Sequence, residues 1–212
     1  MKPNLVLLGA PGSGKGTQAK RLVDGMSYAH VSTGDLLRAE IAKGSDLGNK
    51  VSDIMKAGNL VDDQTVLELL AANCDLKSSS YIFDGFPRNL EQAKMLDEAL
   101  IKDSAAVALF FKIDPNVLVE RIVNRRVAKQ SGEIYNLITR PPKVEGKCDV
   151  SGEDLIHRPD DQEDVVRNRM KVFTDEIEPM LAYYREKGIL KEVDATKGLD
   201  EIYSELETLI NS

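Results

Sequence analysis

The segment Gly9–Thr17, with the sequence GAPGSGKGT, constrains this chain more than any other part of it. A short apolar run, Leu5–Leu8, precedes it and a helical pattern follows, so a glycine-rich turn joins a strand to a helix. The glycines allow successive backbone N–H groups to face one anion, and the positive end of the helix dipole points to the same place. Lys15 adds a full positive charge. The pattern therefore predicts a phosphate-binding loop.

The loop differs from the pattern G-x-x-x-x-G-K-[ST] at one position, because Gly16 stands in the hydroxyl slot and Thr17 follows it. The alternative interpretation is a strand-to-helix turn with an incidental lysine. The flanking patterns favour phosphate binding, since the structural context is present as well as the string. We predict that the chain binds a nucleoside triphosphate or a similar molecule.

Strand patterns alternate with helical patterns along the 212 residues. After Leu5–Leu8, the strand candidates are residues 29–32, 81–84, 107–113 and 190–194. This alternation predicts a parallel sheet with helices on both faces. Residues 126–161 break the rhythm around the alternating stretch Ile134–Ile138, and we expect a small β-rich insertion there. The later apolar stripe from Val166 to Tyr184 contains Pro179, which is expected to kink or divide the helix.

The composition limits the possible partners. A formal net charge of −7 argues against a broad surface for nucleic acid or anionic membranes. No apolar stretch approaches the roughly 20 residues of a membrane span. Cys74 and Cys148 lie far apart and give no disulfide framework, as in proteins of a reducing compartment. We expect a cytoplasmic protein.

Polar residues directly follow the predicted strands. Ligands of parallel sheets bind beyond the carboxyl ends of the strands, so these residues are candidates for the site. They are Thr33, Asp35, Arg38, Asp84 and Arg88. A strand that ends in Asp84 opposite a phosphate loop is the expected place for a carboxylate that holds magnesium or its waters. The alternative is a turn cap before Gly85.

Positive charge in this acidic chain is concentrated at the same places. Two nucleotides brought together for phosphoryl transfer carry roughly five or six negative charges, so their site needs several cations. The cations at strand ends, helix starts or the flanks of the insertion are Lys15, Arg38, Arg88, Arg121, Arg125, Arg158 and Arg169. Taken alone, Arg121 and Arg125 are equally well explained as solvated helix residues.

Nucleophilic catalysis finds no support in the sequence. The chain has two histidines, His30 and His157, and no Ser/His/Asp or Cys/His arrangement is discernible. We interpret His30, inside a strand pattern, as a packing residue. An acceptor phosphate needs no general base because its oxygen is already anionic. Catalysis would then consist of alignment and charge stabilisation.

Three motifs, Gly9–Thr17, Asp84–Arg88 (DGFPR) and Pro141–Gly146 (PPKVEG), together resemble the adenylate kinase family in its long bacterial form. The resemblance covers the whole chain. It implies reversible, Mg²⁺-dependent phosphoryl transfer from ATP to AMP, giving two ADP, by a monomer. The implied architecture is an α/β P-loop three-layer fold with a five-stranded parallel sheet, a helical AMP-binding arm and a small β-rich lid insertion. Its parts are a core of residues 1–31, 62–123 and 162–212, an arm of residues 32–61 and a lid of residues 124–161.

The resemblance also implies a set of site residues. Those for ATP are Gly12, Ser13, Gly14, Lys15, Gly16, Thr17, Arg121, Arg125, Ile134, Tyr135 and Lys197. Those for AMP are Thr33, Arg38, Asn59, Leu60, Val61, Gly85, Phe86, Pro87, Arg88, Gln92, Arg158 and Arg169. Those implied in catalysis are Lys15, Asp84, Arg88, Arg125, Arg158 and Arg169, with Asp84 holding magnesium through water. Asp160 and Asp161 match a pair at the hinge of the lid.

The lid departs from the family pattern at four positions. One branch of the family has metal ligands there, mostly cysteines, and another has a hydrogen-bonded polar set. In this chain the positions hold Ala128, Ser131, Cys148 and Ser151. A structural zinc needs four Cys, His or carboxylate ligands, so we expect none, and Ala128 weakens a polar set as well. We hypothesise that packing of Tyr135, Leu137 and Val144 holds the lid together.

Two other functions remain as alternatives. A UMP/CMP kinase is the nearest, although the full lid with its PPKVEG string favours AMP as the acceptor. A non-catalytic nucleotide-binding switch would need neither a second arginine-rich site nor a lid. The guanine-reading string Asn-Lys-x-Asp of such switches is absent from the sequence.

Overall fold

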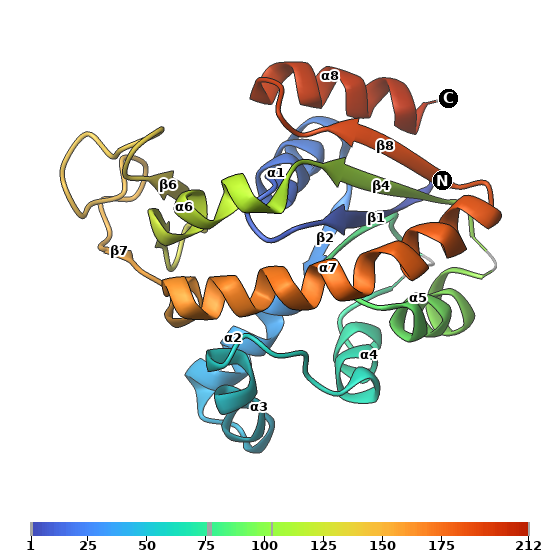
Figure 1. Cartoon of the computed structure of the whole chain (residues 1–212), viewed down its shortest axis with the longest axis horizontal. Helices are drawn as coiled ribbons and strands as arrows, with labels where there is room; N and C mark the ends of the chain where they lie inside the picture. Colours follow the sequence, from blue (N-terminus) through green and yellow to red (C-terminus); the bar gives the residue numbers. More distant parts are fainter. Residues whose placement is uncertain (1, 76–77, 103, 212) are drawn as a thin grey trace.

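The computed structural model describes residues 2–75, 78–102 and 104–211 (Figure 1). Its elements, in chain order, are β1 (Asn4–Gly9), α1 (Lys15–Met26), β2 (Ala29–Ser32), α2 (Thr33–Lys43), α3 (Asp46–Lys56), α4 (Asp63–Ala71), β3 (Tyr81–Asp84), α5 (Leu90–Leu96), the π-helical turn η1 (Asp97–Ile101), β4 (Ala106–Lys112), the 3₁₀ turn η2 (Pro115–Val117), α6 (Leu118–Val123), β5 (Arg125–Ala128), β6 (Ile134–Asn136), β7 (Leu155–Ile156), the 3₁₀ turn η3 (Pro159–Asp161), α7 (Glu163–Glu186), β8 (Leu190–Asp194) and α8 (Leu199–Ile210). The strands and helices alternate as predicted.

A five-stranded parallel sheet forms the centre of the molecule, in the order β2-β3-β1-β4-β8. In the middle strand β1, Leu7 is aligned with Asp84 of β3 on one side and with Leu109 of β4 on the other. The residues of β1 from Asn4 to Leu8 are buried because helices cover both faces. The predicted α/β class and five-stranded parallel sheet are confirmed.

Alternate residues of β1 enter two separate cores. Leu7 packs in a cluster with Leu22 of α1 and Leu206 of α8. Leu8 packs on the opposite face in a cluster that includes Tyr184 of α7. Figure 1 shows α1 and α8 on one side of the sheet and α7 on the other. The three layers leave the carboxyl ends of the strands open at one edge, where the site lies.

A pair of helices, α2 and α3, projects from this edge (Figure 1). The helices touch at Gly48, where an added Cβ would come within 2.2 Å of the Glu40 carbonyl oxygen. Ser45 begins α3 by accepting a hydrogen bond from the Gly48 backbone N–H at 3.0 Å. This pair coincides with the expected arm. Its movement as a separate domain stays a prediction.

A second sheet, with the antiparallel order β6-β5-β7, lies in the expected insertion. Arg126 of β5 pairs with Tyr135 of β6, and Val127 pairs with Ile156 of β7. The expectation of a small β-rich insertion is confirmed. Within the alternating stretch Ile134–Ile138, the strand β6 covers Ile134–Asn136.

Pro179 lies inside α7, which continues unbroken from Glu163 to Glu186. Of the two expected effects of this proline, division of the helix is wrong and a kink stays a prediction. A proline removes one N–H donor and crowds the carbonyl four residues earlier. Ile177, Met180 and Leu181 around it are buried, so packing against the sheet outweighs the local cost.

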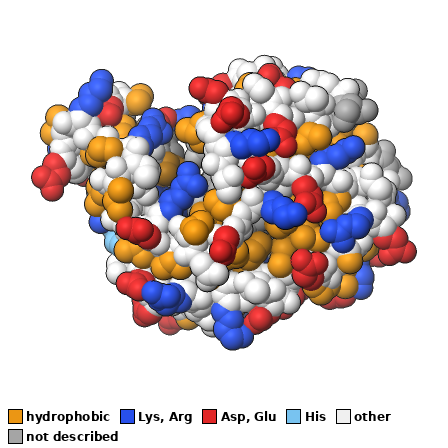
Figure 2. All heavy atoms as spheres, turned by 45° about the horizontal axis from the view of Figure 1, so that its top comes forward, with side chains coloured by type: hydrophobic (Ala, Val, Ile, Leu, Met, Phe, Trp, Pro, Cys, Tyr) orange, Lys and Arg blue, Asp and Glu red, His pale blue; other side chains and the backbone are white. Residues whose placement is uncertain are grey.

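The composition also predicts that the surface carries no broad basic region and that the two cysteines form no disulfide framework. Figure 2 shows basic and acidic side chains interspersed over the visible face. Cys74 and Cys148 are both free thiols. Within the described ranges, none of the helices combines the length and the apolar character that crossing a bilayer requires.

Candidate active site

The phosphate loop follows β1 as predicted, and glycines set its backbone. Gly12 and Gly14 adopt positive φ angles of 79° and 98°, which side chains other than glycine rarely tolerate. Gly14 is the N-cap of α1 and supplies no side-chain acceptor. The N–H groups of the first turn are therefore left for an anion.

Lys15 lies folded over the loop. Its Nζ donates to the carbonyl oxygens of Gly9 at 2.6 Å and Ala10 at 2.9 Å. Burial lowers the pKa of Lys15 to about 8, and Asp84 opposes this shift while three nearby arginines add to it. Lys15 is thus a lysine whose charge is easily lost unless an anion is bound.

Five arginines from distant parts of the sequence converge in front of the loop. They are Arg38 of α2, Arg88 after β3, Arg125 of β5, Arg158 before η3 and Arg169 of α7. Desolvation lowers the pKa of Arg88 to about 10, and the charges of Arg169 and Arg38 act in the same direction. Burial likewise lowers the pKa of Arg158 to about 10, aided by Arg38 and Arg125. These mutual effects require that the guanidinium groups share one cleft.

Aspartates are interleaved with the arginines. Arg125 donates from Nε and Nη2 to the two carboxylate oxygens of Asp161, at 2.8 and 2.5 Å. Arg169 Nη1 lies 3.3 Å from the same buried carboxylate and donates to the Asp160 carbonyl at 2.6 Å. Burial acts to lower the pKa of Arg125, but its bonds with Asp161 outweigh burial and raise it. Both guanidinium groups are fixed in place and stay charged.

A second carboxylate serves the arm side of the cleft. Asp35 accepts a hydrogen bond from Arg38 Nη2 at 2.6 Å and lies 3.5 Å from Arg158 Nη2. Together with Asp84, Asp160 and Asp161, it makes four carboxylates against six cations among the described residues of the cleft. The cleft therefore keeps a net positive charge for anionic ligands.

Asp84 ends β3 directly beside the phosphate loop. An added Cβ on Gly16 would lie 3.5 Å from its Oδ2. Burial acts to raise the pKa of Asp84, but contact with His30 and the charge of Lys15 outweigh it and lower the pKa. An ionised carboxylate therefore stands where the sequence predicts one.

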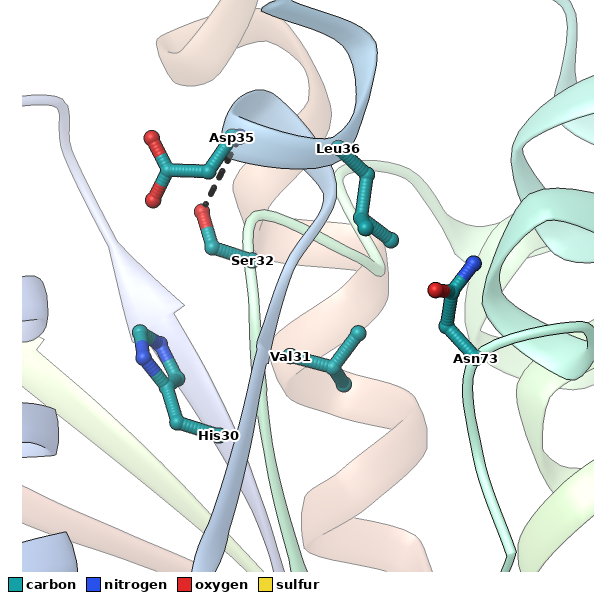
Figure 3. Close-up of a pocket in the computed structure, with 6 residues that line it drawn as sticks. All are labelled: His30, Val31, Ser32, Asp35, Leu36 and Asn73. Carbon is teal, nitrogen blue, oxygen red and sulfur yellow. Dashed lines mark hydrogen bonds between the residues drawn. The ribbon is translucent and has the colours of Figure 1, made fainter. Parts of the chain in front are cut away.

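His30 has its Nε2 3.5 Å from Asp84 Oδ2, so the interpretation of His30 as a packing residue is wrong. In the edge strand β2 it is aligned with Ile82, and Asp84 lies two residues further along on the same face. Figure 3 shows His30 on the opposite side of β2 from Val31. Cross-strand alignment of this kind is invisible in a single strand pattern.

A shallow pocket of about 310 Å³ opens at this edge (Figure 3). It is lined by His30, Val31, Ser32, Asp35, Leu36 and Asn73. Ser32 Oγ accepts a hydrogen bond from the Asp35 backbone N–H and caps α2. The polar groups of this pocket are therefore engaged within the protein, since Asp35 also holds Arg38 and Asn73 donates to the Leu69 carbonyl oxygen.

The predicted AMP residues lie on the arm side of the arginines. An added Cβ on Gly85 would come within 2.7 Å of Thr33 Oγ1. The segment after α3 rests on α7, because a Cβ on Gly58 would lie 3.0 Å from Arg169 Cγ. Asn168 of α7 also donates to Asn59 Oδ1 at 3.0 Å. Thr33 thus lies against Gly85 and Asn59 against α7, while the Val61 side chain is buried in the hydrophobic core.

Gln92 holds the backbone of Arg88 by a side-chain hydrogen bond. Its buried side chain accepts a hydrogen bond from the Arg88 backbone N–H at 2.7 Å. The same side chain donates to Asp63 Oδ1 at 2.7 Å. With both ends of the amide used inside the protein, Gln92 fixes the 85–88 loop.

A second pocket, of about 400 Å³, lies on the other side of the phosphate loop. Ser13 and Gly14 line it together with two predicted ATP residues, Arg121 and Lys197. The Lys197 ammonium pairs with Glu205 at 2.7 Å. Further lining residues that the sequence analysis missed are Gln18, Ile113, Val117, Ala195, Thr196, Gly198, Leu199 and Ile202. Several of them follow β4 or β8, so the strand-end argument could have found them.

Tyr135 lies away from the cleft. Its side chain is 2% exposed, its hydroxyl lies 3.6 Å from Cys148 Sγ, and the Asp149 backbone N–H donates to that hydroxyl at 2.7 Å. The Ile134 carbonyl accepts a hydrogen bond from Arg140 Nη1 at 3.1 Å. The Tyr135 hydroxyl and the Ile134 carbonyl are thus engaged inside the lid, and ATP contact at these two positions stays a prediction.

The packing hypothesis for the lid is right for one residue and wrong for two. Tyr135 clusters with Ala128 and Cys148 in a small core. Leu137 and Val144 are 41% and 63% exposed. A three-stranded sheet of two- to four-residue strands has one narrow buried face, which these side chains do not reach.

Glu153 ties the two turns of the lid together. It accepts hydrogen bonds from the backbone N–H groups of Gln130 at 2.7 Å and Ser131 at 2.9 Å, and from Ser151 Oγ at 2.8 Å. These bonds, that from Gln130 first, lower the pKa of Glu153 to about 2. Over the described residues, no three His, Cys, Asp or Glu side chains are grouped to hold a metal ion.

Comparison with known proteins gives the family of this chain. A family model described as adenylate kinase matches residues 7–189. A Thermosipho melanesiensis protein named adenylate kinase is 45% identical over 212 residues, covering 98% of this chain and 99% of the relative. Proteins of the same name from Thermodesulfovibrio yellowstonii and Archaeoglobus fulgidus are 45% and 41% identical, over 95% and 98% of this chain and 96% and 97% of their own length.

Proposed function

The chain belongs to the adenylate kinase family, and we propose that its phosphate loop and its arginine cleft bind the two nucleotides of that family's reaction. Adenylate kinases are phosphotransferases that act on ATP and AMP and give ADP. One observation carries the residue assignment. Lys15 and five arginines converge between the arm side of the cleft and the second pocket. Each cation comes from a different part of the chain.

The ATP side is the pocket between the loop and the 195–199 segment. Val117 and Leu199 line it, and their apolar side chains are 60% and 43% exposed. A flat base bound there would cover this apolar surface, which water does not. Gly12–Thr17 then wrap the phosphates, with Arg121 and Lys197 among the residues that line the pocket. Arg125 and the 134–135 backbone complete this side from the lid.

The AMP side is the cleft between the arm and α7. The residues that we propose to form it are Thr33, Arg38, Asn59, Leu60, Val61, Gly85, Phe86, Pro87, Arg88, Gln92, Arg158 and Arg169. Arg38 and Arg88 supply charge for the AMP phosphate, while Gln92 acts through Arg88 by holding its backbone. Fixed guanidinium planes favour two-pronged phosphate binding.

Catalysis then rests on position and charge. Lys15, held above the loop, is placed to follow the transferred group. Arg88, Arg125, Arg158 and Arg169 stabilise the negative charge that spreads over that group in the transition state. Because Arg125 and Arg169 are already held by Asp161, they need little reorganisation. No general base is required, since the acceptor is a phosphate oxygen.

Asp84 is the residue that we propose to hold the water ligands of Mg²⁺. Its lowered pKa keeps it ionised, and it lies beside Gly16 of the loop. Mg²⁺ prefers oxygen ligands, keeps several waters and is commonly held by one or two carboxylates, so this donor fits. Bound with ATP, the ion neutralises part of the phosphate charge.

We further propose that residues 32–61 and 124–161 close over the nucleotides as arm and lid. An ion pair between Lys20 of α1 and Glu133 of the lid joins one of these parts to the core. Closure excludes water and suppresses ATP hydrolysis. We also propose a cytoplasmic monomer that binds neither nucleic acid nor membranes, supported by the free thiols and the mixed surface charge.

The experiment is an acceptor panel in which ADP formation from ATP is followed with AMP, UMP, CMP or no acceptor. We expect rapid turnover with AMP and a very low ATPase rate without acceptor. Preference for UMP or CMP would instead favour the related kinase. ATP binding without transfer to any acceptor would favour a non-catalytic switch.

A further inference from the structure

Gln18 lies on α1, three residues after Lys15, and its side chain is fully buried. Its Nε2 donates a hydrogen bond to the Leu199 carbonyl oxygen at 2.9 Å. Because a carbonyl oxygen can only accept, this bond fixes the orientation of the amide. Oε1 of Gln18 is buried and has no hydrogen-bond partner among the described residues.

This bond joins the two walls of the second pocket. Ser13 and Gly14 line one wall, Thr196–Leu199 line the other, and Gln18 itself lines the space between them. Leu199 also begins α8, so the bond ties the helix after the phosphate loop to the start of the last helix. From the exposed side, Arg21 Nη1 donates to the same oxygen at 2.8 Å.

Packing alone does not account for an amide at this position. A buried amide with one unmet acceptor costs free energy that an apolar side chain of the same length avoids. Methionine would fill the space without that cost. What glutamine adds is a directed hydrogen bond to one oxygen of the pocket wall.

We propose that Gln18 is a positioning residue for ATP, which holds the Thr196–Leu199 wall at the spacing that the base requires. This inference rests on the proposed assignment of the second pocket to ATP. Gln18 acts through the wall and leaves the AMP side untouched. Its removal therefore weakens ATP binding selectively.

The test compares Gln18→Met and Gln18→Glu in the full chain, with initial rates measured against ATP and AMP separately. Gln18→Met is expected to raise KM for ATP about three- to tenfold, the loss of one neutral hydrogen bond, with kcat and KM for AMP unchanged. Gln18→Glu is expected to raise it at least as much, because a carboxylate would face the Leu199 oxygen. An unchanged KM for ATP in Gln18→Met overturns the proposal. A wild-type KM for ATP in Gln18→Glu also overturns the proposal, because that variant keeps Oε1 and replaces Nε2. The role would then belong to Oε1.

Two further variants separate this inference from the proposed function. Arg121→Gln alters another residue of the same pocket. If it raises KM for ATP and the Gln18 variants do not, the positioning role fails and the pocket assignment stands. If none of them does, both fail. Gln64→Met changes an exposed glutamine of α4 and is the matched control, with kinetics expected to be unchanged.

Arg21→Met keeps the proposal testable if the Gln18 variants fold poorly. Arg21 is a half-buried residue that gives the second hydrogen bond to the same Leu199 oxygen. A smaller, selective rise in KM for ATP is expected because the buried donor remains. Equal effects on ATP and AMP would contradict the proposal.

Discussion

The cleft and the lid are each tied together by a carboxylate, but the partners of the two carboxylates differ. In the cleft, buried Asp161 accepts hydrogen bonds from the guanidinium groups of Arg125 and Arg169. In the lid, Glu153 accepts them from two backbone N–H groups and the Ser151 hydroxyl. A guanidinium group can bind phosphate while it keeps a carboxylate, whereas the turn's N–H groups are committed to Glu153. The cleft is therefore arranged for ligands and the lid for holding its own shape.

The largest expected effect tests the cleft side of this contrast. Lys15→Met should lower kcat about a thousandfold, since one charge at the transferring group is lost from the transition state. The melting temperature should stay close to that of the wild type, because burial already disfavours the lysine charge. Steady-state kinetics and a thermal melt check this. Retention of most of the activity would remove Lys15 from its proposed role.

The next effect combines activity and stability. Asp161→Asn leaves the Arg125 guanidinium without its carboxylate and leaves Arg169 paired with Asp160 alone, which should destabilise the fold by about 3 kcal/mol. It should also lower kcat, because Arg125 loses its fixed orientation. Denaturant unfolding and kinetics measure the two effects. Asp175→Asn, which removes a surface ion pair with Lys171, is the control and should change neither. Normal kcat in a strongly destabilised Asp161→Asn protein would show that the pair is only structural.

A pH profile separates the effect of the Lys15 charge on activity from its effect on the stability of the fold, and the expected effect is moderate. The pKa of free Lys15 is lowered to about 8, so the ammonium loses its proton as pH rises above that value. Since kcat/KM reports the free enzyme, its value for ATP should fall about tenfold from its plateau by pH 9. Losing a buried charge does not destabilise the fold, because a lowered lysine pKa adds stability as pH rises through it. Lys15→Arg should lack this fall in kcat/KM, and a wild-type profile that stays flat to pH 9 would contradict the shift.

The residues that the sequence revealed and those that it hid differ in how their roles arise. Gly14, Lys15 and Asp84 belong to a local pattern of strand, turn and helix, so their positions follow from the chain alone. Gln18 meets Leu199 across 181 positions, and His30 meets Asp84 across two strands. Such contacts leave no periodic signal, because they depend on how the layers are stacked.

The errors have the same origin. Pro179 and the exposed lid residues Leu137 and Val144 were judged by their own chemistry, while packing decides where each lies. The lid is the part least accessible to such reasoning. Its strands are so short that hydrophobic pattern does not distinguish a core position from a surface one. Glu153, in turn, has the sequence context of any solvated acidic residue.

The lid side of the comparison predicts a smaller effect, on stability alone. Glu153→Gln should lower the melting temperature by on the order of a few degrees, since an amide cannot accept three hydrogen bonds as a carboxylate does. We expect kcat to remain within about twofold, because Glu153 contacts none of the cleft residues in its hydrogen bonds. Glu145→Gln, at an exposed glutamate of the same lid, is the matched control. A loss of kcat without a change in melting temperature would place Glu153 in the chemistry instead.

The smallest expected effect is none at all, and it concerns the four lid positions Ala128, Ser131, Cys148 and Ser151. If Glu153 and the Tyr135 cluster hold the lid, a chelator should leave the melting temperature unchanged. A fall of several degrees would show that a metal contributes. A variant with cysteines at the three other positions is the positive control, because four thiolates are a zinc ligand set and its melt should become chelator-sensitive. Insensitivity of the wild-type chain beside sensitivity of that variant would show that hydrogen bonds to a carboxylate do the work of a metal in this lid.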